Sequence, residues 1–235
     1  MISPVSKRVA AKFWNGERSP RFLCALDHQL CSAGFSFDSH DDAPCSTWAK
    51  DFLDDCAIQL SIWPRSSSPG AFSFHTSISI VCCPKNFASA WESVSGRPGS
   101  VTVLSCSLDW FAICFGLASS FKNLFDDAND VAAVDAPTTA IRVAELGSTV
   151  ASRLSNLFPT RSDLAAALLA LPAFSGSLGG KNGPVSSDPV LFAALLIAAD
   201  GDLVRARKTL SDEALRNPNG SARQDVDRVL SALEI

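Results

Sequence analysis

The sequence predicts an α+β fold, in which an antiparallel β-sheet is covered by an N-terminal helix and followed by an α-helical C-terminal tail or subdomain. Two observations carry this prediction. Between Phe35 and Ser107, apolar and polar side chains alternate with a period of two, which is typical of strands with one buried face. After Asp135 the composition shifts to alanine, leucine and serine, and helix-start signals recur. The expected domains are therefore an α+β sheet domain at 1–135 and a helical subdomain at 136–235.

One helix is expected to precede the sheet, from Ser19 to about Cys31. Ser19 stands at the N-cap, Pro20 occupies the first helical position, and Gly34 provides the stop. His28 is interpreted as a surface imidazole near the negative C-terminal end of this helix. The apolar residues that recur at helical spacing and predict one buried face are Phe22, Leu23, Leu26 and Leu30.

The sheet is predicted to be an antiparallel meander with turn residues between consecutive strands. The segment from Phe72 to Cys82 has the most regular alternation in the chain. In the strand before it, apolar residues alternate with Ala57, Gln59 and Ser61, so one face of that strand is expected to be buried. The other elements expected in this half are strands around Cys45–Phe52, Cys56–Ile62, Val101–Cys106 and Trp110–Leu117, and a short helix over Pro84–Val94.

The second half is predicted to contain helices only. Thr160 and Asp163 have the spacing of a capping box, and Asp188 followed by Pro189 marks another helix start. The Gly- and Ser-rich stretch 175–187 is the best candidate linker. The expected helices run from Thr138 or Thr139 to Phe158, over Leu164–Leu171, over Val190–Ala199, from the break at 200–202 to about Arg216, and from Ser221 to Ile235.

The distribution of charge argues against nucleic acid as the main ligand. Residues 1–120 carry nine basic and ten acidic side chains, and residues 121–235 carry eleven and fourteen. Neither half has a field that attracts phosphate. The longest apolar runs, Leu164–Leu171 and Val190–Ala199, are about half of the ~20 residues that a membrane helix needs, so no membrane span is expected.

All eight cysteines lie at or before Cys114, in the half that is predicted to form the sheet. Residues 1–26 hold no uninterrupted apolar segment typical of a secretory signal, so a cytoplasmic protein with reduced thiols is expected. Because no Cys-x-x-Cys pair occurs, most of the cysteines are interpreted as small core residues. Neither a metal site nor a cofactor is expected.

No motif in the chain assembles a recognisable catalytic centre. The stretch Gly176–Lys181 is one residue short of a phosphate-binding loop and lacks the hydroxyl that follows the lysine of such loops. His40, with Asp41 and Asp42 behind it, is interpreted as part of a solvated turn. A hydrolase that uses this loop or His75 stays open as an alternative. The absence of tyrosine excludes any mechanism with a tyrosine acid.

One set of residues forms the candidate interaction face. If the segments 56–65 and 72–82 are neighbouring strands, small polar side chains share the sheet face that points away from the core. A tryptophan and an arginine border this face, and both residue types are enriched at the energetic centres of protein interfaces. The members of the candidate interaction face are Gln59, Ser61, Trp63, Arg65, Ser73, His75 and Ser77.

The order of these features resembles a family of uncharacterised bacterial proteins that is known only as a domain of unknown function. The resemblance is carried by Leu23, Leu26, Leu30 and Gly34-Phe35, by Trp48, by Ile58, Leu60 and Trp63, by the strand from Phe72 to Ile80, and by Ala199-x-Gly201-Asp202-x-x-x-Ala206. The resemblance extends over nearly the whole chain and implies a soluble α+β domain. It supports a role in partner recognition at least as strongly as a catalytic role. It supplies no catalytic residues.

A non-catalytic protein-interaction module is therefore the function that the sequence favours. An immunity protein or an antitoxin-like inhibitor is the expected type, and a protein is the expected partner. Two other readings stay open, namely a hydrolase with a histidine-centred site and a sensor that binds a small ligand in a cleft between the sheet and the helical tail.

Overall fold

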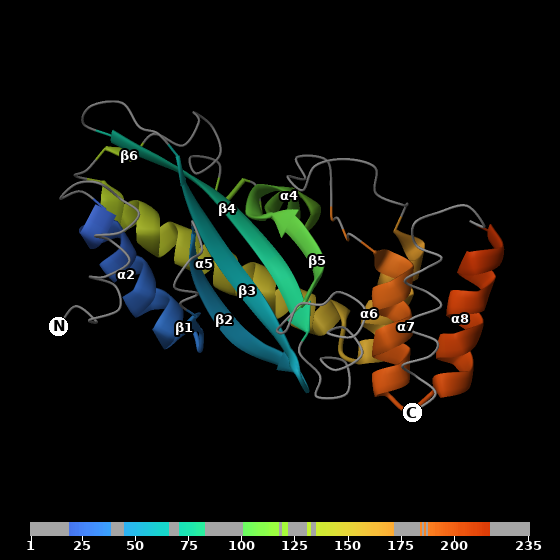
Figure 1. Cartoon of the computed structure of the whole chain (residues 1–235). Helices are drawn as coiled ribbons and strands as arrows, with labels where there is room; N and C mark the ends of the chain where they lie inside the picture. The colour runs from blue at the N-terminus through green and yellow to red at the C-terminus, as the bar shows by residue number, and fades with distance from the viewer. Residues whose placement is uncertain are drawn as a thin grey trace.

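The computed structural model describes residues 19–38, 45–65, 71–82, 101–117, 119–121, 131–132, 135–171, 184, 186 and 188–216. Their architecture is α+β, as the sequence predicts (Figure 1). Four of the predicted features lie wholly or mostly outside these residues: the helices over Pro84–Val94 and 221–235, the loop at His40 and the linker at 175–187. The division of the chain into domains at 1–135 and 136–235 stays a prediction.

Within the described residues, five consecutive strands form the main path of the sheet, in the order β1-β2-β3-β4-β5, and every neighbouring pair is antiparallel. This is the predicted meander. In the β3–β4 ladder Cys56 lies opposite Cys82 and Trp63 lies opposite His75, so alternate residues of both strands share a face. The strands are β1 (Ser36–Asp38), β2 (Ser46–Leu53), β3 (Cys56–Arg65), β4 (Ala71–Cys82) and β5 (Val101–Ser107), and a short β6 (Val131–Ala132) pairs with the beginning of β4.

Two helices, α2 (Ser19–Ser32) and α5 (Ala136–Leu157), lie side by side on one face of the sheet (Figure 1). The ring of Phe22 on α2 has its centroid 4.9 Å from that of Phe74 in β4. Helix α5 approaches β3 so closely that a Cβ added at Gly147 would lie 2.9 Å from Leu60 Cδ2. The predicted cover by the N-terminal helix is thus confirmed, and α5 adds a second covering helix.

The segment Trp110–Leu117, which the sequence predicts as a strand, is instead largely the helix α4 (Leu108–Cys114). Its apolar residues suit a buried strand as well as a short buried helix, so their pattern alone does not distinguish the two structures. The helix buries Leu108, Phe111 and Ala112, which have helical spacing, and carries Asp109 in its first turn, where a negative charge is stabilised. Gly116, with φ of +70°, follows the helix.

The remaining described helices are α6 (Arg161–Ala170), α7 (Pro189–Ala199) and α8 (Leu203–Arg216). The predicted capping box is present at the start of α6, because Thr160 Oγ1 accepts a hydrogen bond from the backbone N–H of Asp163 at 3.2 Å. Helix α7 packs between α6 and α8 and buries nearly its whole surface, including Leu196. The two helices predicted on either side of the break at 200–202 therefore form and pack as a helical hairpin, with Gly201 at φ +87° in the turn between α7 and α8.

None of the helices within the described ranges is both long and apolar enough to cross a membrane. The most apolar of them, α7, has 11 residues, which is about half of the usual length of a spanning helix.

Candidate functional site

The face of the sheet opposite α2 and α5 carries the candidate interaction face predicted from the sequence. Ser61 lies opposite Ser77 and Trp63 opposite His75, so these four residues share it with Gln59. Arg65 and Ser73 are also opposite each other in the ladder, but the structure describes only their backbone.

Hydrogen bonds between side chains cross this face from β1 to β5. They join Gln59 Nε2 to Asp38 Oδ2 at 3.1 Å, Thr47 Oγ1 to Ser61 Oγ at 3.3 Å, Trp63 Nε1 to Ser77 Oγ at 3.4 Å, and Ser79 Oγ to Ser105 Oγ at 3.0 Å. Each bond joins residues on different strands, and the polar side chains are therefore held in fixed positions.

Exposure is uneven over the same face. Thr47 and Ser61 are buried, at 6% and 8% exposed, so they serve as the support of the face rather than as contact groups. The indole of Trp63 is 39% exposed and reaches diagonally from β3 to Ser77 on β4. A large amphipathic side chain is thus held on the surface by its own N–H group.

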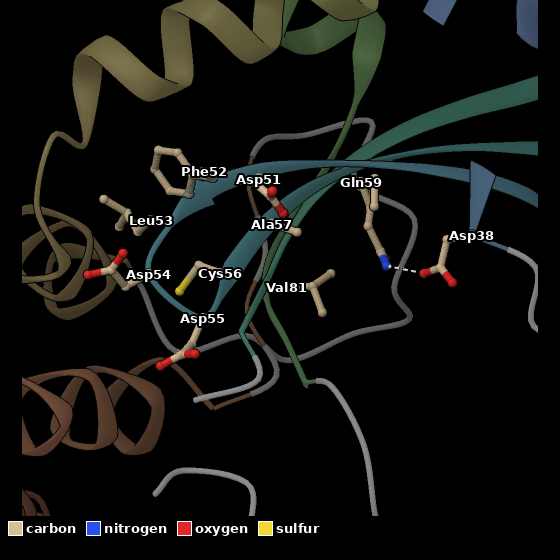
Figure 2. Close-up of a pocket in the computed structure, with 11 residues that line it drawn as sticks. Asp38, Asp51, Phe52, Leu53, Asp54, Asp55, Cys56, Ala57, Gln59 and Val81 are labelled. Carbon is tan, nitrogen blue, oxygen red and sulfur yellow. Dashed lines mark hydrogen bonds between the residues drawn. The ribbon is translucent and has the colours of Figure 1, made fainter. Parts of the chain in front are cut away.

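At one end of this face lies a hollow of about 780 Å³, which we call the acidic hollow (Figure 2). Four of its lining residues are aspartates. Gln59 also lines it, between β1 and the hairpin that joins β2 to β3 (Figure 2). Asp54 and Asp55 project from the tip of this hairpin (Figure 2). The complete lining is Asp38, Ala49, Asp51, Phe52, Leu53, Asp54, Asp55, Cys56, Ala57, Gln59 and Val81.

Sequence reasoning missed the acidic hollow because its aspartates come from different elements. Asp38 is in β1, Asp51 is in β2, and Asp54 and Asp55 form the turn. The pair Asp54-Asp55 between two strand patterns is the one local signal, since aspartate favours turns. Asp55 adopts φ of +60°, a left-handed conformation that aspartate tolerates better than most residues.

One arginine connects this hairpin to the helical half of the chain. The Arg161 guanidinium donates to the backbone carbonyl of Asp54 at 2.7 Å and to Asp200 Oδ1 at 3.1 Å, and it lies 3.5 Å from Asp55 Oδ2. Its side chain is 16% exposed, so these interactions are only partly screened by solvent. Arg161 therefore fixes the hairpin to the beginning of α6 and the end of α7.

Beneath the hairpin, two cysteines face each other across the β3–β4 ladder. The Cys56 and Cys82 sulfur atoms are 2.7 Å apart, and both residues are buried, at 4% and 0% exposed. The hydrogen bond from Cys82 lowers the pKa of the Cys56 thiol, and the positive charge of Arg161 lowers it further, against the opposing effect of burial. The prediction that most cysteines fill the core is correct for Cys56, Cys82 and Cys106 but wrong for Cys31 and Cys114, which are exposed, and it misses this pairing.

The hydrolase reading depends on histidines that the structure describes only in part. His28 is exposed on α2, as predicted, and His75 lies opposite Trp63 on the polar face. His40 is outside the described part of the chain. Although four aspartates line the acidic hollow, no three described His, Cys, Asp or Glu side chains form a group that would hold a metal ion.

A second cavity, of about 200 Å³, lies where α4, the end of α5 and α6 meet. Two of the rings that line it, Phe111 and Phe115, are stacked with their centroids 5.7 Å apart. Almost all of its lining is apolar: Leu104, Trp110, Phe111, Cys114, Phe115, Leu157, Phe158, Leu164, Ala167, Leu168, Leu171 and Pro184.

Searches with the whole chain matched no family model, no curated protein and no solved structure. The resemblance to an uncharacterised bacterial family stays a prediction, and the site must be interpreted from its own geometry.

Proposed function

We propose that the chain is a non-catalytic interaction module that binds and inhibits a partner protein, in the manner of an immunity or antitoxin-like protein. The observation that carries the proposal is the polar face of the sheet, with a fixed network of hydrogen bonds, an exposed tryptophan and the acidic hollow at one end. A surface that is ordered before binding loses little conformational entropy when a partner docks.

Charge supports a partner that presents lysine or arginine side chains. Asp51, Asp54 and Asp55 are exposed at the acidic hollow. Among the described residues, Arg161 forms an ion pair with only one of these three carboxylates, that of Asp55. The whole chain has a net charge of −4, so long-range attraction acts in the same direction. A hollow of about 780 Å³ has room for several side chains of a partner's basic loop.

Trp63 supplies the expected anchor of the interface. Tryptophan is enriched among interface residues that contribute most of the binding energy, and a tyrosine anchor is ruled out because the chain has none. The hydrogen bond to Ser77 holds the indole in one orientation, which reduces the entropy lost on binding.

The proposal predicts that Trp63→Ala weakens partner binding at least tenfold, which corresponds to about 1.4 kcal/mol. The full chain, immobilised, is used to recover the partner from a lysate of its source organism, and the purified partner is then titrated by calorimetry. Asp51→Asn combined with Asp54→Asn should lower the association rate and the salt dependence of binding. An inhibitor must also abolish an activity of the partner at a one-to-one ratio.

The matched control is Leu157→Ala, which removes a side chain that is 55% exposed on α5, outside the polar face and the acidic hollow. It should leave the affinity unchanged. Equal affinity of the wild type and Trp63→Ala for the recovered protein, or loss of affinity in Leu157→Ala alone, would contradict the proposal.

The apolar cavity favours a second candidate function, the sensing of a small ligand. Its position between α4, next to the sheet, and α6 of the helical tail matches the cleft that such a sensor needs. Since it is lined almost entirely by carbon, it suits a small hydrophobic molecule such as a monocyclic aromatic compound or a short aliphatic chain.

For this candidate, Ala167→Phe is expected to fill the cavity and abolish the uptake of a hydrophobic probe such as indole. Ala167 lines the cavity, whereas Ala166 on the same helix is exposed and does not. Ala166→Phe therefore adds the same side chain without filling the cavity and should retain uptake. Titration calorimetry with indole compares the two variants, and equal uptake by both would rule out the cavity as the binding site.

A further inference from the structure

One of the two facing cysteines, Cys56, lines the acidic hollow, yet partner binding makes no use of either thiol. Cys56 and Cys82 are directly opposite each other in the register of β3 and β4, with their sulfur atoms in contact. Cross-strand partners of this kind have Cα atoms about 4.5–5.5 Å apart, which lies within the range that a disulfide spans. The two thiols therefore need no rearrangement of the backbone to react with each other.

The surroundings of the pair favour one of the two sulfurs as the nucleophile. Arg161, which is itself held by Asp200 and by the carbonyl of Asp54, places its positive charge near Cys56. A thiolate beside an arginine is the reactive form of cysteine. Once Cys56 is a thiolate it can only accept the hydrogen bond that the two sulfurs share, so Cys82 is then the donor and is in position to attack Cys56 next.

The acidic hollow borders the pair at Cys56, whose side chain is on the buried face of β3. Only 4% of the residue is exposed, so a reagent must be small to reach the sulfur. Asp51, Asp54 and Asp55 stand at the same hollow and repel anions. A small uncharged hydroperoxide fits both conditions, whereas the anionic disulfide of glutathione fits neither.

We propose that Cys56 and Cys82 are an oxidisable dithiol that small hydroperoxides convert to a disulfide, with Cys56 as the attacking thiolate and Cys82 as the resolving thiol. With hydrogen peroxide, the Cys56 thiolate displaces hydroxide and becomes a sulfenic acid, and the proton that Cys56 released converts the hydroxide to water; an alkyl hydroperoxide releases its alcohol at this step instead. The Cys82 sulfur then attacks the sulfenic sulfur, forms the S–S bond and releases a second water. Two thiols and one hydrogen peroxide thus give one disulfide and two waters.

The test is peroxide oxidation of the reduced full chain, followed by alkylation of the remaining thiols and peptide mass spectrometry. Equimolar hydrogen peroxide at neutral pH should link tryptic peptides 51–65 and 66–85 through a disulfide. The second peptide also contains Cys83, so Cys83→Ser should keep the link while Cys82→Ser abolishes it. Arg161→Leu should slow the reaction about tenfold, because the thiolate loses its positive neighbour.

Cys31 provides the matched control thiol. It is exposed, but burial of its sulfur and the nearby Asp27 raise its pKa, so it should be oxidised after Cys56 despite its better access. Oxidised glutathione should react more slowly with Cys56 than hydrogen peroxide does. If Cys31 is oxidised while Cys56 stays reduced in the folded chain, or if the disulfide forms through Cys83 instead, the proposal is overturned.

Discussion

Trp48→Ala is expected to destabilise the fold by about 3–5 kcal/mol, which is the usual cost of removing a fully buried tryptophan. Trp48 in β2 is 1% exposed, and its ring packs edge-on against Phe37, with centroids 5.2 Å apart. Its Nε1 also donates to Asp27 Oδ1 on α2 at 3.0 Å. The substitution therefore opens a cavity and breaks a bond between the sheet and its covering helix. Urea unfolding followed by circular dichroism measures the loss.

Trp63→Ala is the matched control, because it removes the same side chain one strand away but on the exposed face. It should cost less than about 1 kcal/mol. Trp48→Phe isolates the indole N–H, and it should cost about 1–3 kcal/mol because a ring remains in place. Similar losses in Trp48→Ala and Trp63→Ala would mean that the assignment of the two faces is wrong.

Between pH 9 and 12 the protein is expected to lose about 3 kcal/mol of stability through one buried thiol. Burial raises the pKa of Cys106 from its ordinary value of 9.0 to about 12. A group whose pKa is raised on folding contributes stability below its unfolded value and loses it as the pH rises towards the folded value. Three pH units at about 1.4 kcal/mol each give about 4 kcal/mol for the whole titration. About 3 kcal/mol of this falls between pH 9 and 12, because the thiol is half ionised in the unfolded chain at pH 9 and in the folded chain at pH 12.

The measurement compares urea unfolding of the wild type and Cys106→Val at pH 9 and pH 12. Valine keeps an apolar side chain of similar size in the core but cannot ionise, so the variant should lack this part of the alkaline loss. The chain has no tyrosine, so no buried phenol titrates in the same range. Cys114→Val changes an exposed cysteine on α4 and should behave like the wild type. An identical alkaline loss in Cys106→Val would contradict the prediction.

The sheet was predictable because its physical signals are local. The period-two alternation in the segment 72–82 places the inward residues of β4 correctly, and a buried face also specifies the register. The same holds for the capping box at Thr160, where two side chains three residues apart satisfy the helix terminus. Trp110–Leu117 was predicted wrongly because a short apolar run fits a buried helix and a buried strand equally well.

The candidate site was predictable only in part, because its residues meet through tertiary contacts. Gln59, Ser61, Trp63, His75 and Ser77 come from two adjacent strands, and alternation alone places them together. The acidic hollow needs β1, the β2–β3 hairpin and the register between them. Arg161 contacts the hairpin although more than a hundred residues separate them in the sequence. Cys56 faces Cys82 because of the register between β3 and β4. Neither contact has a signal in the residues close to it in the sequence.

Hydrogen–deuterium exchange of the free chain and of its complex with the recovered partner tests the central claim most directly. The account predicts that binding protects backbone amides around Asp51–Ala57 and along the stretches of β3 and β4 near Trp63 and His75, while exchange in α8 is unchanged. Protection confined to α7 and α8, with the polar face and the acidic hollow exchanging as in the free chain, would contradict it.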